Sequence, residues 1–135
     1  MAIDSALEAV RAGMDYERLR LDAASRNIAN ANVPVAHGKA ATLWRVDGGV
    51  AAGGFARVAG SPDDLVIGER EAQTREVHDP GHPMANAEGM VRYPQVDLVQ
   101  EMTTMMTASR GYEANVRSFN FLRNMMLRAI EIGAK

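Results

Sequence analysis

The residues best suited to chemistry in this chain lie in the stretch VHDPGHPMAN, residues 77–86. His78 and His82 have the H-x-x-x-H spacing that binds zinc when both rings share one face of a helix, and Asp79 would be a third ligand. A Pro-Gly pair separates the two histidines, so no helix aligns their rings. The stretch therefore favours a tight turn, and a small metal-dependent hydrolase is the weakest of three hypotheses for function.

Covalent and phosphate chemistry have little support in the sequence. Ser, His and Asp all occur, but no G-x-S-x-G elbow positions a serine nucleophile. The glycine-rich run GGVAAGG lacks the spacing of a phosphate-binding loop and the lysine that should follow it. The chain contains no cysteine, which excludes a thiol nucleophile, a disulfide and a cysteine-ligated zinc. We therefore expect no enzymatic activity, no catalytic residues, no metal and no cofactor.

The bulk properties argue against two further classes of protein. A net charge of −2 and a pI near 5.9 disfavour binding to a phosphate backbone, so we expect no nucleic-acid partner. No run approaches the ~20 apolar residues of a membrane span, so we expect no membrane insertion. The start MAIDSALEAV lacks the basic residues and unbroken apolar core of a secretory signal. Any export would need a route without a cleaved signal.

A periodic apolar stripe predicts one long helix over residues 1–32. Its positions recur in alternating steps of four and three, the spacing of a helix face that packs along a partner helix. Ser5 and Glu8 have the spacing of a capping box at the start of this helix. Asp22 and Arg26 offer an i,i+4 ion pair on its outer face. Glu17 interrupts the stripe, whose contributions to a candidate assembly interface are Ile3, Leu7, Val10, Met14, Leu21 and Ile28.

A second stripe of the same spacing predicts a long helix over residues 95–135. Asp97 and Gln100 are placed to cap its start, and Gly133 follows as its stop. Eight of the ten stripe positions fit, with Ser109 and Arg123 as the exceptions. From this stripe the candidate interface takes Leu98, Met102, Met105, Tyr112, Val116, Phe119 and Met126.

The middle of the chain, residues 33–94, differs in kind, with nine of the twelve glycines and all five prolines. The short apolar pieces TLWRV, FARVA and DLVIG predict strands between turns. We expect a mainly α protein whose terminal helices pair antiparallel, like a coiled coil, and form one helical domain. A small, irregular β-rich insert separates them. Because two such helices cannot bury both stripes, the Met-rich remainder predicts an assembly rather than a monomer.

The stretch SRNIANANVP, residues 25–34, places three asparagines at the exit of the first helix. Asparagine tolerates the left-handed conformation that closes a helix. We expect Asn30 and Asn32 to serve the local turn, and Asn27 to reach across to another helix. Asn27, Asn30 and, in the second helix, Asn115 complete the candidate assembly interface.

The second helix carries two further features that each allow two interpretations. Gly111 costs ~1 kcal/mol relative to Ala inside a helix, which indicates close approach of another helix or tolerance in a long one. A solvated face is the default for charged side chains, although in an assembly they would form ion pairs between subunits. The charged residues in question are Arg110, Glu113, Arg117 and Arg123.

Two sequence segments resemble a known family. RLRLDAASRNIANANV resembles the N-terminal signature of bacterial flagellar rod and hook proteins. VHDPGHPMANAEGMVRYPQVDLVQEMTTMMTASRGYEANV and the later NMMLRAIEIG are similar to the proximal-rod FlgC family of flagellar basal-body rod proteins. Residues 39–76 match nothing in that pattern.

The resemblance implies a non-enzymatic subunit of the rod that crosses the periplasm, with terminal helices lining the core of a higher-order helical oligomer. It implies partners among copies of the chain itself, other rod subunits, a rod-base adaptor and the export apparatus. It also implies export by the flagellar type III route. A soluble helical adaptor or chaperone that binds partner helices through its Met-rich stripe is the alternative.

Overall fold

The computed structural model describes residues 2–47 and 65–133 and shows two long helices that flank a small β insert. This confirms the expected fold class. The predicted strand FARVA lies outside the described residues. The elements are α1 (Ala2–Asn30), β1 (Ala41–Asp47), β2 (Val66–Ala72), β3 (Thr74–His78), β4 (Met90–Pro94) and α3 (Leu98–Gly133).

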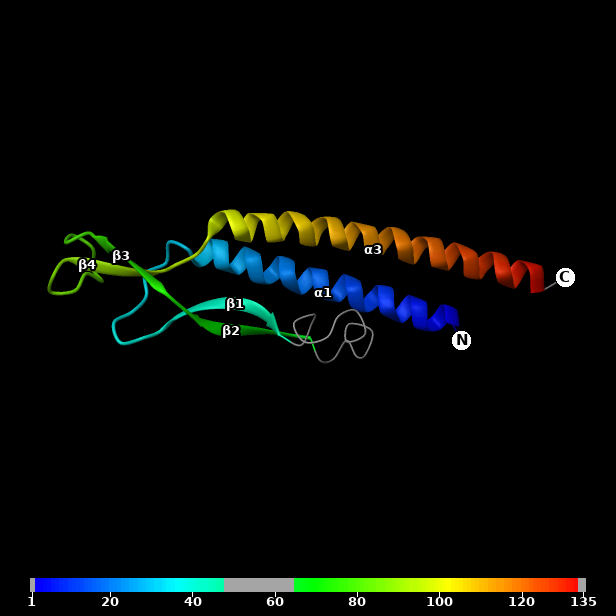
Figure 1. The fold of residues 1–135 in the computed structure, drawn as a ribbon, viewed down its shortest axis with the longest axis horizontal. Helices are drawn as coiled ribbons and strands as arrows, with labels where there is room; N and C mark the ends of the chain where they lie inside the picture. Colours follow the sequence, from blue (N-terminus) through cyan, green and yellow to red (C-terminus); the bar gives the residue numbers. More distant parts are fainter. Residues whose placement is uncertain (1, 48–64, 134–135) are drawn as a thin grey trace.

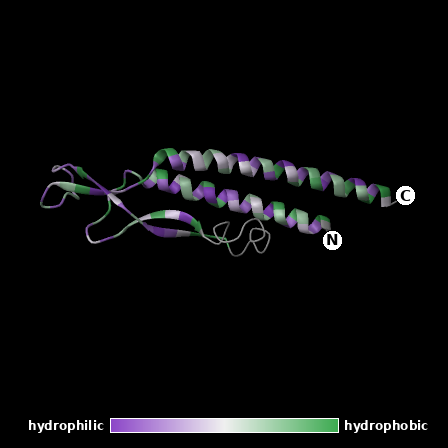
Figure 2. Cartoon of the chain, in the orientation of Figure 1, coloured by the Kyte–Doolittle hydropathy of each residue, from purple (hydrophilic) through white to green (hydrophobic). Residues whose placement is uncertain are grey.

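Helices α1 and α3 lie side by side and run antiparallel, so the start of α1 and the end of α3 are at the same end of the molecule (Figure 1). Helix α3 has 36 residues and α1 has 29. Both helices alternate hydrophilic and hydrophobic residues along their length (Figure 2). Neither of these helices, as far as they are described, is long and apolar enough to cross a membrane.

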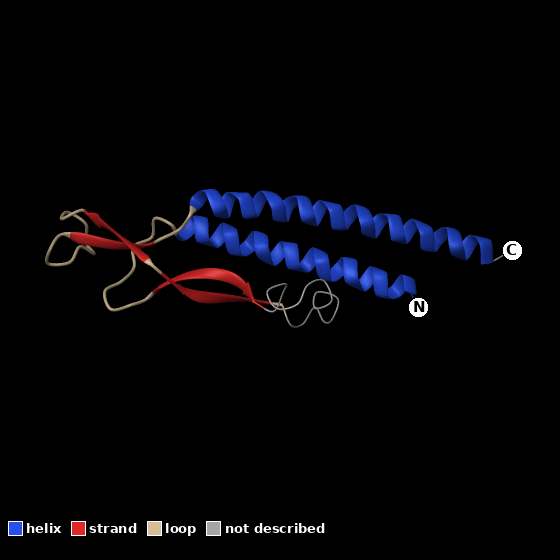
Figure 3. Ribbon diagram, in the orientation of Figure 1, coloured by secondary structure: helices blue, strands red, loops and turns tan. Residues whose placement is uncertain are grey.

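The insert forms two separate antiparallel hairpins (Figure 3). Strand β1 pairs with β2 in a register that sets Trp44 opposite Glu69, and β3 pairs with β4 so that Val77 faces Val91. The first hairpin lies along α1, whereas the second extends past the ends of the helices (Figure 1). The sequence predicted β1 and β2 but missed β3 and β4, which flank the predicted turn.

The helix ends bear out one predicted cap and correct another. The Oδ1 of Asp97 accepts a hydrogen bond from the backbone N–H of Gln100 at 3.1 Å, as expected for the residue before α3. The capping box at Ser5 is wrong, because α1 already begins at Ala2 and Ser5 lies inside the helix. The predicted ion pair between Asp22 and Arg26 is confirmed at 3.0 Å.

Asn27 attaches β1 to α1. Its side chain is fully buried, its Nδ2 donates to the carbonyl oxygen of Trp44 at 2.9 Å, and its Oδ1 accepts from the N–H of Trp44 at 2.7 Å. The amide thus pairs with both backbone groups of one residue, as a neighbouring strand would. The prediction that Asn27 reaches to another helix is therefore wrong, since its partner is a strand of the same chain.

The next residue of β1 reaches the other helix. The Nη1 of Arg45 donates to the Oε1 of Glu101 at 2.8 Å, and Glu101 is buried in α3. The guanidinium of Arg26 stacks on the ring of Trp44 at 4.7 Å from its centroid. Two consecutive residues of β1 therefore hold the hairpin against both helices and fix its place beside them.

We predict that Asn27→Ala lowers the free energy of unfolding by about 1–3 kcal/mol, because it removes both partners of the Trp44 backbone. Thermal or urea unfolding of the purified chain, followed by circular dichroism, measures the loss. Asn30→Ala is the matched control from the same motif. The Asn30 side chain is exposed and makes no hydrogen bond within the described residues. Equal losses in the two variants would contradict this role for Asn27.

Candidate assembly interface

The two helices approach closely where each carries a glycine opposite a polar side chain of the other. A Cβ atom built on Gly13 would lie 3.0 Å from the Nδ2 of Asn115. A Cβ atom on Gly111 would lie 2.8 Å from the Cδ of Glu17. Each glycine is one helical turn from the polar residue on its own helix, so the exchange is reciprocal. Of the two interpretations of Gly111, the structure shows the close approach of another helix.

Glu17, the one break in the apolar stripe of α1, fills the space above Gly111. Its carboxylate is largely buried and pairs with Arg20 at 2.9 Å. Elsewhere the buried apolar residues of the two helices are all small, namely Ala12, Ala23, Ala24 and Ala108. Small residues and glycine contacts therefore set the closest approach of the two helices, and half-buried large side chains such as Leu21 and Met105 lie beside it.

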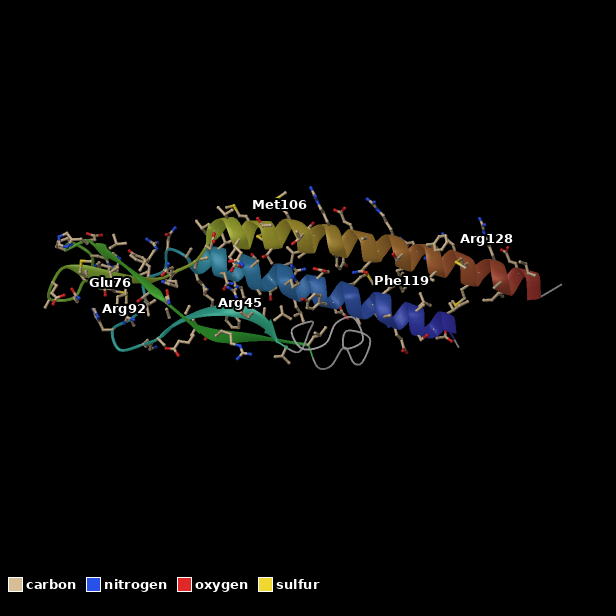
Figure 4. All side chains as sticks on the ribbon, in the orientation of Figure 1. Arg45, Glu76, Arg92, Met106, Phe119 and Arg128 are labelled. Carbon is tan, nitrogen blue, oxygen red and sulfur yellow. The ribbon has the colours of Figure 1, made fainter. Side chains whose placement is uncertain are left out.

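The predicted interface residues of α1 are half-buried, except for the buried Asn27 and the exposed Asn30. On α3, Leu98, Met102 and Tyr112 are exposed. The half-buried members on α3 are Met105, Asn115, Val116, Phe119 and Met126. Figure 4 shows Phe119 on the edge of α3 toward α1 and Met106 on the edge away from it. The stripes' role as an assembly interface stays a prediction.

Several large apolar side chains of α3 that the sequence stripe omitted are exposed. Ile132 is 77% exposed, Phe121 65% and Met106 59%. A single stripe cannot describe a helix that is apolar on more than one face. The signal that could have found them is the number of apolar residues in the second half of α3, which exceeds what one helix face can hold.

The junction after α1 uses its asparagines differently from the expectation. The backbone N–H of Val33 donates to the carbonyl oxygen of Asn30 at 3.0 Å, which closes the turn. The side chain of Asn32 instead accepts from Arg75 of β3 at 3.0 Å, and the same guanidinium donates to the carbonyl oxygen of Ala31 at 3.3 Å. Arg75 thus caps the C-terminal end of α1, where orphan carbonyls favour a cation.

The histidines lie at the far end of the second hairpin and are engaged in its turn. The Nδ1 of His82 accepts a hydrogen bond from the N–H of Met84 at 3.1 Å. Gly89 has a φ of +75°, and a side chain there would press against His78 and Pro80. Within the described residues, no group of three or more His, Cys, Asp or Glu side chains is placed to hold a metal.

A cavity of about 280 Å³ opens between α1, β1 and α3. Two cations face it, and both are paired, Arg20 with Glu17 and Arg45 with Glu101. The described residues that line it include no His, Ser or Cys. Tyr16 and Thr104 supply its hydroxyl groups, and the carboxylate of Glu101 is held in the ion pair with Arg45.

Comparison with known proteins gives a consistent set of relatives. The profile of the family described as Flagellar basal body rod FlgEFG protein C-terminal matches residues 87–132, which include β4 and nearly all of α3. The flagellar basal-body rod protein FlgC of Escherichia coli O6:H1 is 35% identical over 134 residues, 98% of this chain and 99% of the relative. The FlgC of Salmonella typhimurium is 32% identical over 140 residues, with coverage of 98% and 99%. The FlgC of Aquifex aeolicus is 28% identical over 144 residues, with 97% of both chains covered.

We predict that Gly111→Leu lowers the free energy of unfolding by about 1–3 kcal/mol, because the new side chain overfills the contact with Glu17. Unfolding of the purified chain followed by circular dichroism measures it. Ala114→Leu, at an exposed position of the same helix, should change it by no more than about 0.5 kcal/mol. Adding Glu17→Ala to Gly111→Leu should recover part of the loss. An equal effect of the two leucines would refute the close approach.

Proposed function

The chain belongs to the family of the flagellar basal-body rod protein FlgC, whose members are structural subunits of the proximal rod, and we propose that it joins the rod through the outward faces of α1 and α3. Its place in the cell is the flagellar basal body. Family membership favours a rod subunit over the helical adaptor and the metal-dependent hydrolase.

The observation that carries this proposal is the mismatch between the packed and the exposed residues of α3. Small residues join α3 to α1, while Phe121, Ile130 and Ile132 remain largely exposed. Full burial of such a side chain contributes roughly 1.5–3 kcal/mol, and contacts within the described part of the chain provide only part of this free energy. Large apolar side chains left exposed on a helix in this number favour contact with another protein.

The partners that we propose are copies of the chain itself, other rod subunits, a rod-base adaptor and the flagellar export apparatus. The rod would cross the periplasm as a higher-order helical oligomer. We further propose export by the flagellar type III route without a cleaved signal. A purely mechanical role, with no enzymatic activity, is consistent with the paired charges of the central cavity.

We predict that deleting the gene from its source bacterium abolishes swimming and leaves basal bodies without a rod. The wild-type gene should restore both, whereas the double variant Ile130→Ser/Ile132→Ser should restore neither, because it removes two exposed apolar contacts. Swimming assays and electron microscopy of basal bodies measure the outcome.

Glu131→Ser is the matched control, since it changes an exposed residue between the two isoleucines. It should restore swimming. Circular dichroism of the purified isoleucine variant should match the wild type, because exposed residues add little to folding. Normal swimming of the deletion strain, with intact rods, would overturn the proposed function.

A further inference from the structure

Helix α1 carries a continuous charged face on the side opposite α3. The residues recur in the same steps of four and three as the apolar stripe, displaced by one position, so they share one face. This face lies about half a turn around the helix from Gly13 and Glu17, which contact α3. All its members are exposed except Asp22, which is intermediate. The α1 charged face consists of Asp4, Glu8, Arg11, Asp15, Arg18 and Asp22.

Helix α3 carries a matching polar face that turns away from α1, although Arg110 and Glu113 also border an open groove lined by Leu21 of α1. This polar face lies about half a turn around the helix from Gly111 and Asn115, which contact α1. Its side chains are all exposed, and that of Arg117 is 84% exposed. Arg128 points away from α1 in Figure 4. The α3 polar face consists of Arg110, Glu113, Arg117, Asn120, Asn124 and Arg128.

Most of these charges have no ion-pair partner within the described residues. Two ion pairs do involve these residues, and each joins side chains of the same helix: Asp22 with Arg26 at 3.0 Å, and Glu113 with Arg117 at 3.9 Å. The residues without such a partner are Glu8, Arg11, Asp15, Arg18, Arg110 and Arg128. These six side chains are therefore exposed charges that another molecule can pair with.

We propose that the α1 charged face of one copy packs antiparallel against the α3 polar face of a second copy. This inference rests on the proposed function and adds to it one specific partner and register. We call each pair of residues that face one another across this contact a row. Every row then places unlike charges, or a charge and an amide, opposite each other. The rows are Asp22 with Arg110, Arg18 with Glu113, Asp15 with Arg117, Arg11 with Asn120, Glu8 with Asn124, and Asp4 with Arg128.

The alternation of sign selects this register against its neighbours. A shift of one helical turn in one direction would set Arg18 against Arg110, Asp15 against Glu113 and Arg11 against Arg117. A shift in the other direction would set Asp22 against Glu113 and Arg18 against Arg117. Like charges placed face to face cost far more than an exposed ion pair contributes. The charged rows therefore specify alignment more than affinity.

The ends of the helices favour the antiparallel direction. In the proposed register, Met102 of one copy lies across from Ala29 of the other, and both are exposed in the single chain. A parallel arrangement can also form three ion pairs, in which Asp15, Arg18 and Asp22 face Arg110, Glu113 and Arg117. It places Arg11, however, opposite the apolar N-terminal end of α3. Only the antiparallel arrangement matches both the charged and the apolar part of each face.

The two faces lie on opposite sides of one helix pair, so the contact is head to tail. Each copy that uses its α1 charged face still offers its α3 polar face to the next. Heterologous contacts of this kind continue into a ring or an open helical array, whereas a self-complementary contact stops at a dimer.

Disulfide cross-linking tests the alignment, because the natural chain contains no cysteine. The variant Asp15→Cys/Arg117→Cys is produced in the deletion strain, and its isolated basal bodies are oxidised and analysed on non-reducing gels. We expect a species of twice the chain mass of 14.6 kDa and higher multiples. The control Asp15→Cys/Arg110→Cys, which would join in a parallel arrangement, should give none. The two cysteines of one chain cannot join, since they lie on opposite sides of the helix pair.

Charge reversal provides the second measurement. Asp15→Arg and Arg117→Asp should each weaken association of the chain about tenfold or more, and the double variant should recover most of the loss, because reversal of both partners restores unlike charges. Sedimentation of purified chain over a range of concentrations reports association.

Swimming of the cysteine variants separates this inference from the proposed function. If cells with the Asp15→Cys/Arg117→Cys variant swim but the two cysteines form no disulfide between chains, the proposed α1–α3 contact between copies is wrong. The rod assignment then still holds. Joining of the Asp15 and Arg110 pair would overturn the antiparallel direction. Failure of the double charge reversal to recover association would overturn the pairing.

Discussion

The structure depends on the close antiparallel contact of α1 and α3 through residues that have little or no side chain. Gly13 and Gly111 each admit a polar side chain of the opposite helix, Asn115 and Glu17 respectively. Because these two contacts are one helical turn apart on both helices, they fix the axial register of α1 against α3. Several large apolar side chains of α3, among them Phe121 and Ile132, are left largely exposed.

Attachment of the insert follows from that contact. Two buried polar residues, Asn27 on α1 and Glu101 on α3, bind consecutive residues of β1. Both bonds can form only if the two helices hold a fixed relation, since one strand must reach both. Buried polar groups with satisfied partners specify a unique arrangement more than they add stability. Hydrogen bonds and an ion pair thus position the insert, whereas close packing at the glycines positions the two helices.

The sequence predicts features that depend on local pattern and misses those that depend on partners. Both helices, the Asp97 cap and the Asp22–Arg26 pair follow from spacing within one segment. Strands β3 and β4 were missed because their apolar alternation is short and broken by charged residues such as Arg75. The partner of Asn27 could not be read from the sequence, because an amide at a helix exit can serve a turn, a strand or a helix equally well.

The difference between Glu17 and the large apolar residues of α3 shows how the chain separates folding from assembly. A charged residue in an apolar stripe would ordinarily weaken helix packing, but Gly111 gives Glu17 space and Arg20 neutralises its charge. The intramolecular contact can therefore form without using Met106 or Phe121. A chain that buried these side chains within its own fold would have no large apolar side chains left for contact with another subunit. Because glycine and alanine set the closest approach of its helices, this chain folds with large apolar side chains of α3 exposed, and we propose that these contact neighbouring subunits.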